Sequence, residues 1–488
     1  MHPAHSAALL SMDSSVFLQH ISDAFRHVFD NPDKAGISLM QYLPEDQWRY
    51  LKEQGLLLPF LPPEWGGRPH NQFEIQEVLR IAGHYGVGVT LRTGIEGALV
   101  LQPLTEFGNE AVIRAGLDLI FRGEGGGLAI TEPAVSGSAI AREMQSAYEH
   151  IGNGRIRLTA RKYWQGNSQG DFLLVAAKER SNGRLGKNIS LIFVPREHIR
   201  CDVLQSEGLR AVRYAVNHID AELPADYVMS LNVGEAGSLR TFQNIFIRSR
   251  LQLIGMTHGI IEHIAETVVN YAKTAIPFVA REIHEINRRR GVSAVLYDYT
   301  CTEVTPEKPV SGQLLEANVI KALATEYTYA AAQTAQKLLG AKGFEFGHPL
   351  STIALDIRPF TIFEGPNDML YAEIFDQFAK PNDAEREAGV KIDKNQNLWQ
   401  RLVDDSRFSG SRSAAAAEHA ALAEVRAQLK HTGFGDVDAL QKVFVGRILA
   451  KWFVLARCED ADTFAFLVRE IRKDGLEWQD ALAEPEQG

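Results

Sequence analysis

Cysteine and excess positive charge are both scarce in this chain. The 488 residues include 3 cysteines, Cys201, Cys301 and Cys458, and their spacing matches no metal site. So few cysteines are typical of a protein in a reducing compartment, and we expect a cytoplasmic location. The formal net charge is −10, which argues against non-specific binding of nucleic acid. We therefore expect neither a nucleic-acid partner nor a metal centre.

Long hydrophobic runs and the common nucleotide-binding motifs are absent too. No apolar run is long enough to cross a bilayer, and the N-terminus lacks the basic start and apolar core of a signal peptide. No Gly-x-Gly-x-x-Gly is present in the predicted strand region, and the glycine-rich segment 123–127 lacks the Lys-Ser/Thr of a phosphate loop. No serine nucleophile elbow is found. We expect no transmembrane segment, and a bound dinucleotide would need a geometry other than the Rossmann one.

What the chain contains is the composition of an ordinary globular protein, with 45% hydrophobic and 23% charged residues. Its length suggests about three domains. Helical spacing in residues 1–126 gives way to short strands with glycine and asparagine turns in 127–236, and long helices return in 237–380. A polar, charged run then opens a helical extension over 381–488. We predict an α+β multidomain fold with these four segments.

Particular stretches support this division. Apolar side chains recur at helical spacing in 73–82, whereas 155–160 alternate as a half-buried strand does. The basic cluster at 288–290 is predicted to be a solvated helix face, and the alternative is a contact with the phosphates of CoA or the acidic surface of a carrier protein. The predicted helices are 46–54, 73–82, 97–106, 110–121, 238–273, 278–300, 313–339, 414–429, 437–458 and 461–472. The predicted strands are 155–160, 172–177, 189–194 and 214–220.

One acidic residue is a candidate for catalysis. Glu364 lies between Phe363 and Gly365, after an alanine-rich helix and a glycine-bearing turn. An aromatic ring and a flexible backbone can partly desolvate a carboxylate, which raises its pKa and suits it to accept a proton near neutral pH. The alternative interpretation is an ordinary glutamate in a surface turn.

The stretch from Gly340 to Gly365 resembles the C-terminal box of the acyl-CoA dehydrogenases, which is Gly-Gly-x-Gly-[Tyr/Phe], an Arg-Asp pair and Ile-Tyr-Glu-Gly-Thr. The resemblance covers roughly residues 40–380. It implies the acyl-CoA dehydrogenase fold, with an N-terminal helical domain, a middle β-barrel or sandwich domain and a C-terminal four-helix bundle, here followed by an extra helical segment. It also implies that Glu364 is the catalytic base. Lys337, Ala341 and Pro366 depart from the family pattern.

Two further motifs resemble parts of these enzymes that meet the flavin. Residues 129–139 (AITEPAVSGSA) resemble Ala-x-Thr-Glu-Pro-Gly-Ala-Gly-Ser-Asp, with one extra residue and with Ala139 in place of the Asp. Small residues of this kind let backbone N–H groups approach an anion. Residues 162–167 (KYWQGN) resemble Lys-x-Trp-Ile-Thr-Asn, which implies that Trp164 lies against the flavin. Gly166 replaces the threonine that bonds the flavin N5, as in acyl-CoA oxidases, and is predicted to leave room for oxygen.

A fourth motif begins at Arg250, which resembles an arginine that relatives place near the thioester. Ser249 stands where some relatives carry the catalytic glutamate instead, so Glu364 is the only candidate base that matches. A second arginine, which relatives aim at the flavin phosphates of the neighbouring subunit, is Ala275 here. The loss of such a charge-assisted pair would weaken flavin binding by about 1.5–3 kcal/mol.

The resemblance implies one cofactor, FAD. By resemblance, the residues that bind it are Ala129, Ile130, Thr131, Ser138, Trp164, Gln165, Gly166, Gln336, Gly340, Pro366 and Asn367. The residues that bind the thioester are, in the same way, Ser138, Arg250 and Gly365.

The function implied is the FAD-dependent α,β-dehydrogenation of an acyl thioester, carried on CoA or on a carrier protein, to the trans-2-enoyl thioester, as in fatty acid metabolism. The electrons would pass to an electron-transfer flavoprotein or to O2. Two alternatives stay open: an acyl-CoA oxidase that uses O2, and a flavin-free binding or scaffold protein, which Ala139, Ala275 and Pro366 favour. We also predict a homodimer, because the apolar runs 443–449 and 452–455 of the extension must be covered and the outer face of the bundle lies nearest.

Overall fold

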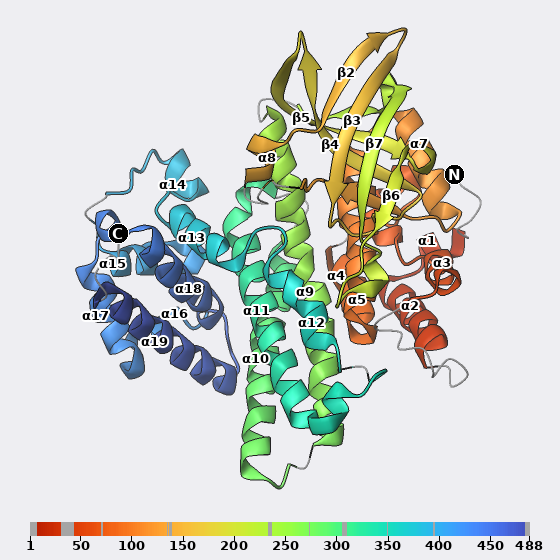
Figure 1. Ribbon diagram of the computed structural model, residues 1–488. Helices are drawn as coiled ribbons and strands as arrows, with labels where there is room; N and C mark the ends of the chain where they lie inside the picture. Colours follow the sequence, from red (N-terminus) through yellow and green to blue (C-terminus); the bar gives the residue numbers. More distant parts are fainter. Residues whose placement is uncertain are drawn as a thin grey trace.

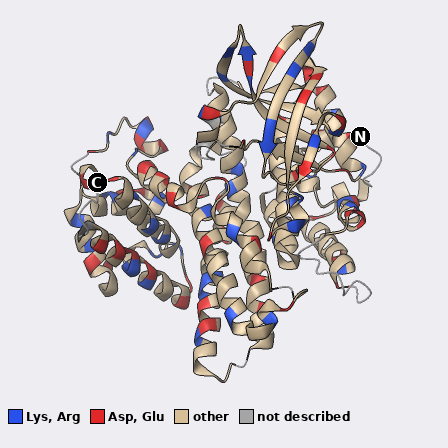
Figure 2. Cartoon of the chain, viewed as in Figure 1, with Lys and Arg blue, Asp and Glu red and all other residues tan. Residues whose placement is uncertain are grey.

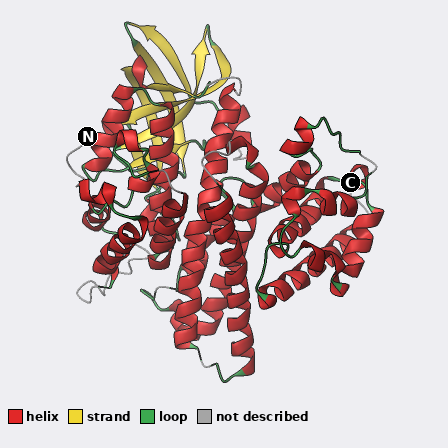
Figure 3. Cartoon of the chain, turned by 180° about the vertical axis from the view of Figure 1, so that it is seen from behind, coloured by secondary structure: helices red, strands yellow, loops and turns green. Residues whose placement is uncertain are grey.

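Long helices run through the middle of the molecule (Figure 1). The sheet and the N-terminal helices lie on one side of them, and the C-terminal helices lie on the other. In the described part of the chain, strands occur in one region only, at the top of the view in Figure 3. The computed structural model describes residues 7–30, 43–69, 72–133, 135, 139–232, 237–272, 274–304, 310–348, 350–393 and 396–483.

Amphipathic helices form the first part of the chain. They are α1 (Ala7–Ser11), α2 (Ser14–Phe29), α3 (Glu45–Glu53), α4 (Gln72–Tyr85), α5 (Val87–Gly94), the π-helical η4 (Ile95–Leu101), α6 (Gln102–Phe107) and α7 (Glu110–Phe121). In α2, Phe17, Ile21 and Phe25 recur every four residues and are buried. The loop between α3 and α4 turns tightly at Gly67, where a Cβ atom would lie 1.9 Å from the carbonyl oxygen of Leu61. The loop therefore requires a glycine at this position.

A sheet of eight strands follows. The strands are β1 (Gly126–Ala129), β2 (Ala147–Gly152), β3 (Arg155–Tyr163), β4 (Phe172–Ser181), β5 (Arg184–Pro195), β6 (Arg200–Val203), β7 (Ala215–Pro224) and β8 (Val228–Ser230). Their order is β6-β7-β3-β2-β4-β5-β8, and β1 pairs with β4 in parallel. Side chains of β3 alternate between exposed and buried along most of its length, as the sequence predicts. The short helix α8 (Ile140–Glu143) lies between β1 and β2.

Three long helices and one shorter helix form the bundle. They are α9 (Gly237–Tyr271), α10 (Pro277–Glu303), α11 (Leu314–Leu339) and α13 (Asn367–Phe378), with α12 (Ile353–Ile357) between the last two. Helix α9 lies in the middle and packs against α4, α10 and α11. The helical N-terminus, the sheet and the helical C-terminus confirm the predicted fold class.

The extension is a compact group of helices that packs on one side of the bundle. It contains α14 (Asp383–Glu387), α15 (Leu398–Asp404), α16 (Ser413–Glu418), α17 (Ala423–His431), α18 (Ala439–Leu455) and α19 (Ala461–Ala483). Helix α18 crosses α13 so closely that a Cβ atom at Gly446 would lie 2.0 Å from the carbonyl oxygen of Tyr371. One hydrophobic cluster, which includes Ile320, Ile374 and Ile448, joins the extension to α11 and α13.

Two expectations for this half of the chain are wrong. The cluster 288–290 does not form a solvated face, because Arg288 lies 3.5 Å from Asp462 of α19 and Arg289 lies over the ring of Phe466. Both signs of charge occur along α10 and α19 (Figure 2). The predicted helix 414–429 is interrupted at His419, whose backbone is extended. Among the described helices, none is long and apolar enough to cross a membrane.

Candidate active site

Glu364 lies in a turn of unusual backbone geometry. The turn joins the 3-10 segment η12 (Arg358–Thr361) to α13, and the φ angle of Glu364 is +56°. Gly365 follows with φ +105°, a conformation that favours glycine. A non-glycine residue in the left-handed region costs about 1–3 kcal/mol and persists only where its surroundings hold it. The contacts around Glu364 are therefore required to hold this backbone conformation.

The two carboxylate oxygens of Glu364 have different environments. The hydroxyl of Ser249 donates a hydrogen bond to Oε1, whereas Oε2 is buried and has no hydrogen-bond partner in the described structure. Burial raises the pKa of Glu364, and the Ser249 hydrogen bond, Arg250 and Lys321 lower it in part. Oε2 is thus the oxygen that is free to take a proton, on a carboxyl whose pKa is moved toward neutrality.

The two positions at which relatives carry the catalytic glutamate, 249 and 364 in this chain, lie in contact. Ser249 occupies the alternative position on α9, and its hydroxyl contacts the carboxylate of Glu364. The two positions therefore meet at one place in the fold, although 115 residues separate them. The sequence comparison alone did not show this contact.

Arg250 is committed largely to the protein. Its Nε atom donates to the carbonyl oxygen of Glu364 at 2.9 Å, and its Nη1 atom donates to Oδ1 of Asn318 at 2.6 Å. Its side chain is 12% exposed, and Glu373 of α13 lies 3.7 Å away. Arg250 therefore holds the backbone of the turn, and a contact with the thioester stays a prediction.

Lys321 of α11 also belongs to this group, although the sequence motifs did not predict it. Its Nζ atom donates to the carbonyl oxygen of Gly365 at 2.7 Å and to Oδ1 of Asn367 at 2.8 Å. The residue is 0% exposed, and burial lowers the pKa of Lys321 to about 7, while Glu364 acts to raise it. The available signal was a charged residue in the otherwise apolar run 319–324.

The predicted flavin residues of the sheet region form a second group. Ala129 and Ile130 are buried and Thr131 is half-buried, whereas the indole of Trp164 is 47% exposed and lies 5.5 Å from the ring of Tyr214. Gln165 is buried and donates from Nε2 to Asn217, but its Oε1 atom has no hydrogen-bond partner in the described structure. This group presents an open aromatic face beside an unpaired amide oxygen.

The predicted room beside Gly166 is not present. A Cβ atom at Gly166 would lie 2.1 Å from Cδ1 of Ile95 and 2.8 Å from Cγ1 of Val212, so these two side chains fill the space. Ile95 begins the π-helical η4, and the next residue, Glu96, is buried and accepts hydrogen bonds from Trp48 and Asn167. The expectation that Gly166 admits oxygen is therefore wrong in this structure.

The remaining predicted residues lie apart from one another. Gln336 is tied to the backbone, since its Nε2 atom donates to the carbonyl oxygen of Ser351 at 2.7 Å. It lies 15 residues beyond Lys321 on α11, which corresponds to about 22 Å along the helix. Gly340 is exposed at the end of α11, and Pro366 is exposed at the start of α13. Ser138 lies outside the described residues.

Asn367 joins the group around Glu364. Its Nδ2 atom donates to the carbonyl oxygen of Ala322 at 3.1 Å and to the hydroxyl of Thr325 at 3.2 Å. The structure therefore brings Glu364, Gly365, Asn367 and Arg250 together. It holds the sheet residues as a second group, and it leaves Gln336 and Gly340 at the far end of α11.

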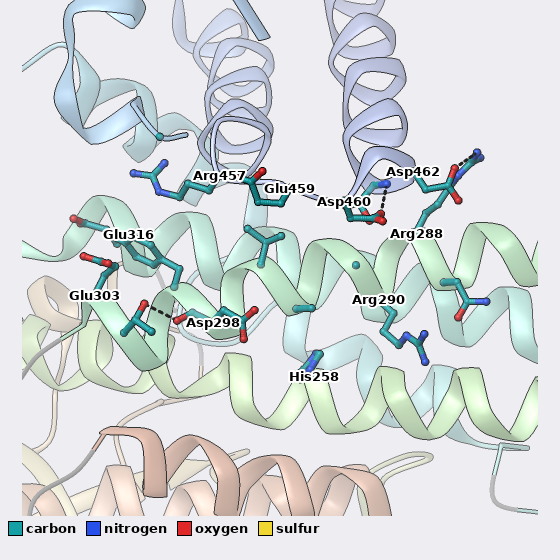
Figure 4. Close-up of a pocket in the computed structure, with 18 of the residues that line it drawn as sticks. His258, Arg288, Arg290, Asp298, Glu303, Glu316, Arg457, Glu459, Asp460 and Asp462 are labelled. Carbon is teal, nitrogen blue, oxygen red and sulfur yellow. Dashed lines mark hydrogen bonds and ion pairs between the residues drawn. The ribbon is translucent and has the colours of Figure 1, made fainter. Parts of the chain in front are cut away.

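Two large hollows lie away from Glu364. One, of about 1090 Å³, lies between α10 and the loop that joins α18 to α19, and charged side chains such as Arg290, Asp298 and Asp460 line it (Figure 4). The other, of about 1160 Å³, is lined by the sheet, including Arg161 and His218. Glu364 lines neither hollow, so neither contains the candidate base.

The sheet residues fit the FAD that the family resemblance implies. The half-exposed Trp164 offers a surface on which a flat ring can lie, and Oε1 of Gln165 is a buried acceptor without a partner in the described chain. Gly166 can contribute only its backbone, because Ile95 fills the place of a side chain. The fit depends on the indole face and on backbone groups.

Comparison with known proteins identifies the family. The model of the acyl-CoA dehydrogenase N-terminal domain matches residues 19–124, and that of the acyl-CoA dehydrogenase C-terminal domain matches residues 239–378. The very long-chain specific acyl-CoA dehydrogenases of mitochondria from Homo sapiens and Bos taurus are 22% and 23% identical to this chain over 383 and 382 residues. These matches cover 74% of this chain and 58% of each relative.

Solved structures show the same fold at low sequence identity. Butyryl-CoA dehydrogenase from Megasphaera elsdenii has a TM-score of 0.63 at 16% identity, covering 75% of this chain and 99% of its own. The prolyl acyl carrier protein oxidase AnaB has a TM-score of 0.65 at 17% identity, covering 75% and 98%. The FAD complex of PigA has a TM-score of 0.63 at 19% identity, covering 78% and 98%. The two domain models together cover half of the sequence, and the chain therefore belongs to the acyl-CoA dehydrogenase family.

Proposed function

We propose that this protein catalyses the FAD-dependent α,β-dehydrogenation of an acyl thioester, carried on CoA or on a carrier protein, to the trans-2-enoyl thioester. The observation that carries the proposal is the buried, unpaired Oε2 atom of Glu364. An ordinary surface glutamate would have both oxygens in water, whereas this one is desolvated and its other oxygen is held by Ser249. Those are the properties of a general base.

In the proposed reaction, Oε2 of Glu364 removes the α-proton of the thioester. Ser249 fixes the carboxylate through Oε1, so that the proton is taken by one defined atom. The backbone N–H of Glu364 is proposed to donate to the thioester carbonyl, which stabilises the negative charge that develops as the proton leaves. Arg250, bonded to the carbonyl oxygen of Glu364, holds the following peptide unit, Glu364–Gly365, in place.

The cofactor would be held mainly by the sheet residues. Trp164 would lie against the ring, the peptide groups of Ala129, Ile130 and Thr131 would approach its edge, and Gln165 would offer an acceptor. FAD, when bound, supplies a hydride acceptor. The other predicted contacts, from Ser138, Gly166, Gln336, Gly340, Pro366 and Asn367, are part of the same proposal.

The electron acceptor is proposed to be an electron-transfer flavoprotein rather than O2. The sequence argument for O2 depended on space beside Gly166, and Ile95 and Val212 fill that space. The alternative of a flavin-free scaffold is tested by purification, since a protein that carries the absorption spectrum of a bound flavin excludes it.

The experiment that tests the base is Glu364→Gln, with exchange of the α-proton of butyryl-CoA and palmitoyl-CoA measured in deuterated water. We expect a loss of about 10²–10⁴-fold, the usual contribution of a general base, with flavin content and unfolding midpoint close to wild type. Glu345→Gln is the matched control, because Glu345 is an exposed acid that pairs with Lys342. Exchange at the wild-type rate in Glu364→Gln would remove Glu364 as the base.

We also propose a homodimer in which the extension covers the outer face of the bundle. Its support is the hydrophobic cluster that joins the extension to α11 and α13. Light scattering tests the homodimer, and a tetramer of the full chain would contradict it.

A cytoplasmic location stays a prediction, as does a role in fatty acid metabolism. All three cysteines are free in the structure.

A further inference from the structure

We propose that Lys321 is a positioning residue for Glu364, whose Nζ atom holds the turn 364–367 in the shape that leaves Oε2 free. The inference rests on the proposed function, because it concerns the same carboxylate. It assigns a role to a residue that was not among the predicted site residues.

The first part of the argument is the backbone of the turn. Two successive carbonyl oxygens are each bound by a cation: that of Glu364 by Arg250 at 2.9 Å and that of Gly365 by Lys321 at 2.7 Å. Glu364 has a positive φ angle, which a residue other than glycine keeps only where its surroundings hold it. Hydrogen bonds from charged groups are about twice as strong as those between neutral groups. The two cations, from α9 and α11, therefore supply that support.

The second part is the start of α13. The same Nζ atom donates to Oδ1 of Asn367 at 2.8 Å, and Asn367 in turn bonds α11 through Ala322 and Thr325. One lysine thus connects the turn to the first residue of α13. Asn367 follows Glu364 by only three residues in the sequence, so a displacement of Asn367 would also move the carboxylate.

The third part is the charge that a lysine carries into a buried place. Lys321 is 0% exposed, and a neutral donor could have made the same hydrogen bonds at a smaller desolvation cost. The charged groups around it are Glu364 of the turn and Arg250 of α9, with Glu373 of α13 next to Arg250. Glu364 favours the charged form of Lys321, and Lys321 favours the charged form of Glu364. The charge therefore acts on the base as well as on the turn.

The test compares Lys321→Met with Lys321→Arg in the full-length protein. The titration of Glu364 is followed by pH-difference infrared spectroscopy of the carboxyl band, and the band that Glu364→Gln removes is the band assigned to this residue. We expect the midpoint to rise in Lys321→Met, because the variant removes a positive charge that lowers the pKa of Glu364. In Lys321→Arg, which keeps the charge, the midpoint should stay closer to wild type.

A matched control and a second measurement separate charge from packing. Lys178→Met removes another buried lysine, whose Nζ atom donates to the carbonyl oxygen of Arg142 at 2.9 Å in the sheet region, and it should leave the Glu364 band unchanged. The pH profile of α-proton exchange should move in Lys321→Met in the same direction as the infrared midpoint. A Glu364 midpoint that is the same in Lys321→Met and wild type would overturn the inference. The proposed function would fail separately, through retained exchange in Glu364→Gln.

Discussion

Replacing Gly166 by threonine would restore the residue that the dehydrogenases carry, and we expect it to destabilise this protein. The added Cβ atom would lie 2.1 Å from Cδ1 of Ile95 and 2.8 Å from Cγ1 of Val212, both shorter than side chains tolerate. Ile95 is buried and begins η4, so it cannot swing into solvent without disturbing the helix. Overpacking of this kind costs about 1–3 kcal/mol.

A double-mutant cycle would show whether Ile95 is the cause. Ile95→Ala alone should cost about 2–5 kcal/mol, because it leaves a cavity. In the double variant, the threonine would occupy part of that cavity, so the total cost should be smaller than the sum of the two single costs by about 0.5–3 kcal/mol. The free energy of unfolding would be measured with urea and circular dichroism.

The control for this cycle is Gly435→Thr. A Cβ atom at Gly435 meets nothing within 4 Å, and its φ angle is not positive, so the substitution should change stability little. Two results would refute the reasoning: a Gly166→Thr variant as stable as wild type, or single costs that simply add. Either would mean that the side chain of Ile95 does not fill the space beside Gly166.

Three further changes should have defined effects. Gly365→Ala should lower both stability and α-proton exchange, because the φ angle of +105° disfavours a side chain and a Cβ atom would lie 3.1 Å from Leu370. Thermal unfolding and exchange rates measure these effects, and an unchanged unfolding temperature would contradict the prediction. Ser249→Ala should shift the acid limb of the exchange profile to higher pH, since the hydrogen bond that lowers the pKa of Glu364 is lost; a limb that stays in place would be evidence against that role. Burial raises the pKa of Asp356 to about 6, above its unfolded value of about 3.9, so the folded state binds the proton more tightly and stability falls as pH rises from about 4 to 6. Asp356→Asn should remove about 2–3 kcal/mol of this decline, and unfolding curves that keep the wild-type pH dependence would count against it.

The sequence predicted the family motif and most helices because these depend on local patterns. The prediction of a helix over 110–121 coincides with α7, whose Asn109 side chain accepts from the backbone of Val112 as an N-cap. The resemblance also pointed to Glu364. Local spacing could not show that Ile95 fills the space beside Gly166, because the two residues are far apart in sequence and meet only through tertiary packing.

Two other misses have the same origin. The sequence shows Lys321 only as a single charged residue in an alanine-rich helix. The acceptors of its Nζ atom come from the turn 364–367, which is far away in the sequence. The predicted helix 414–429 follows helix propensity, yet its backbone is extended at His419, whose ring lies 5.9 Å from that of Phe464 in α19. Propensity is a weak prior that tertiary contacts override.

The close crossing of α18 over α13 connects the C-terminal extension to the turn that carries Glu364. Helix α13 begins three residues after Glu364, and α18 contacts it through Gly446 at Tyr371 and through an ion pair between Arg447 and Asp368 at 2.9 Å. The extension therefore supports the helix that follows the proposed base, Glu364. A partner or a protease that loosens the contact between α18 and α13 would therefore change the position of the Glu364 carboxylate from outside the site.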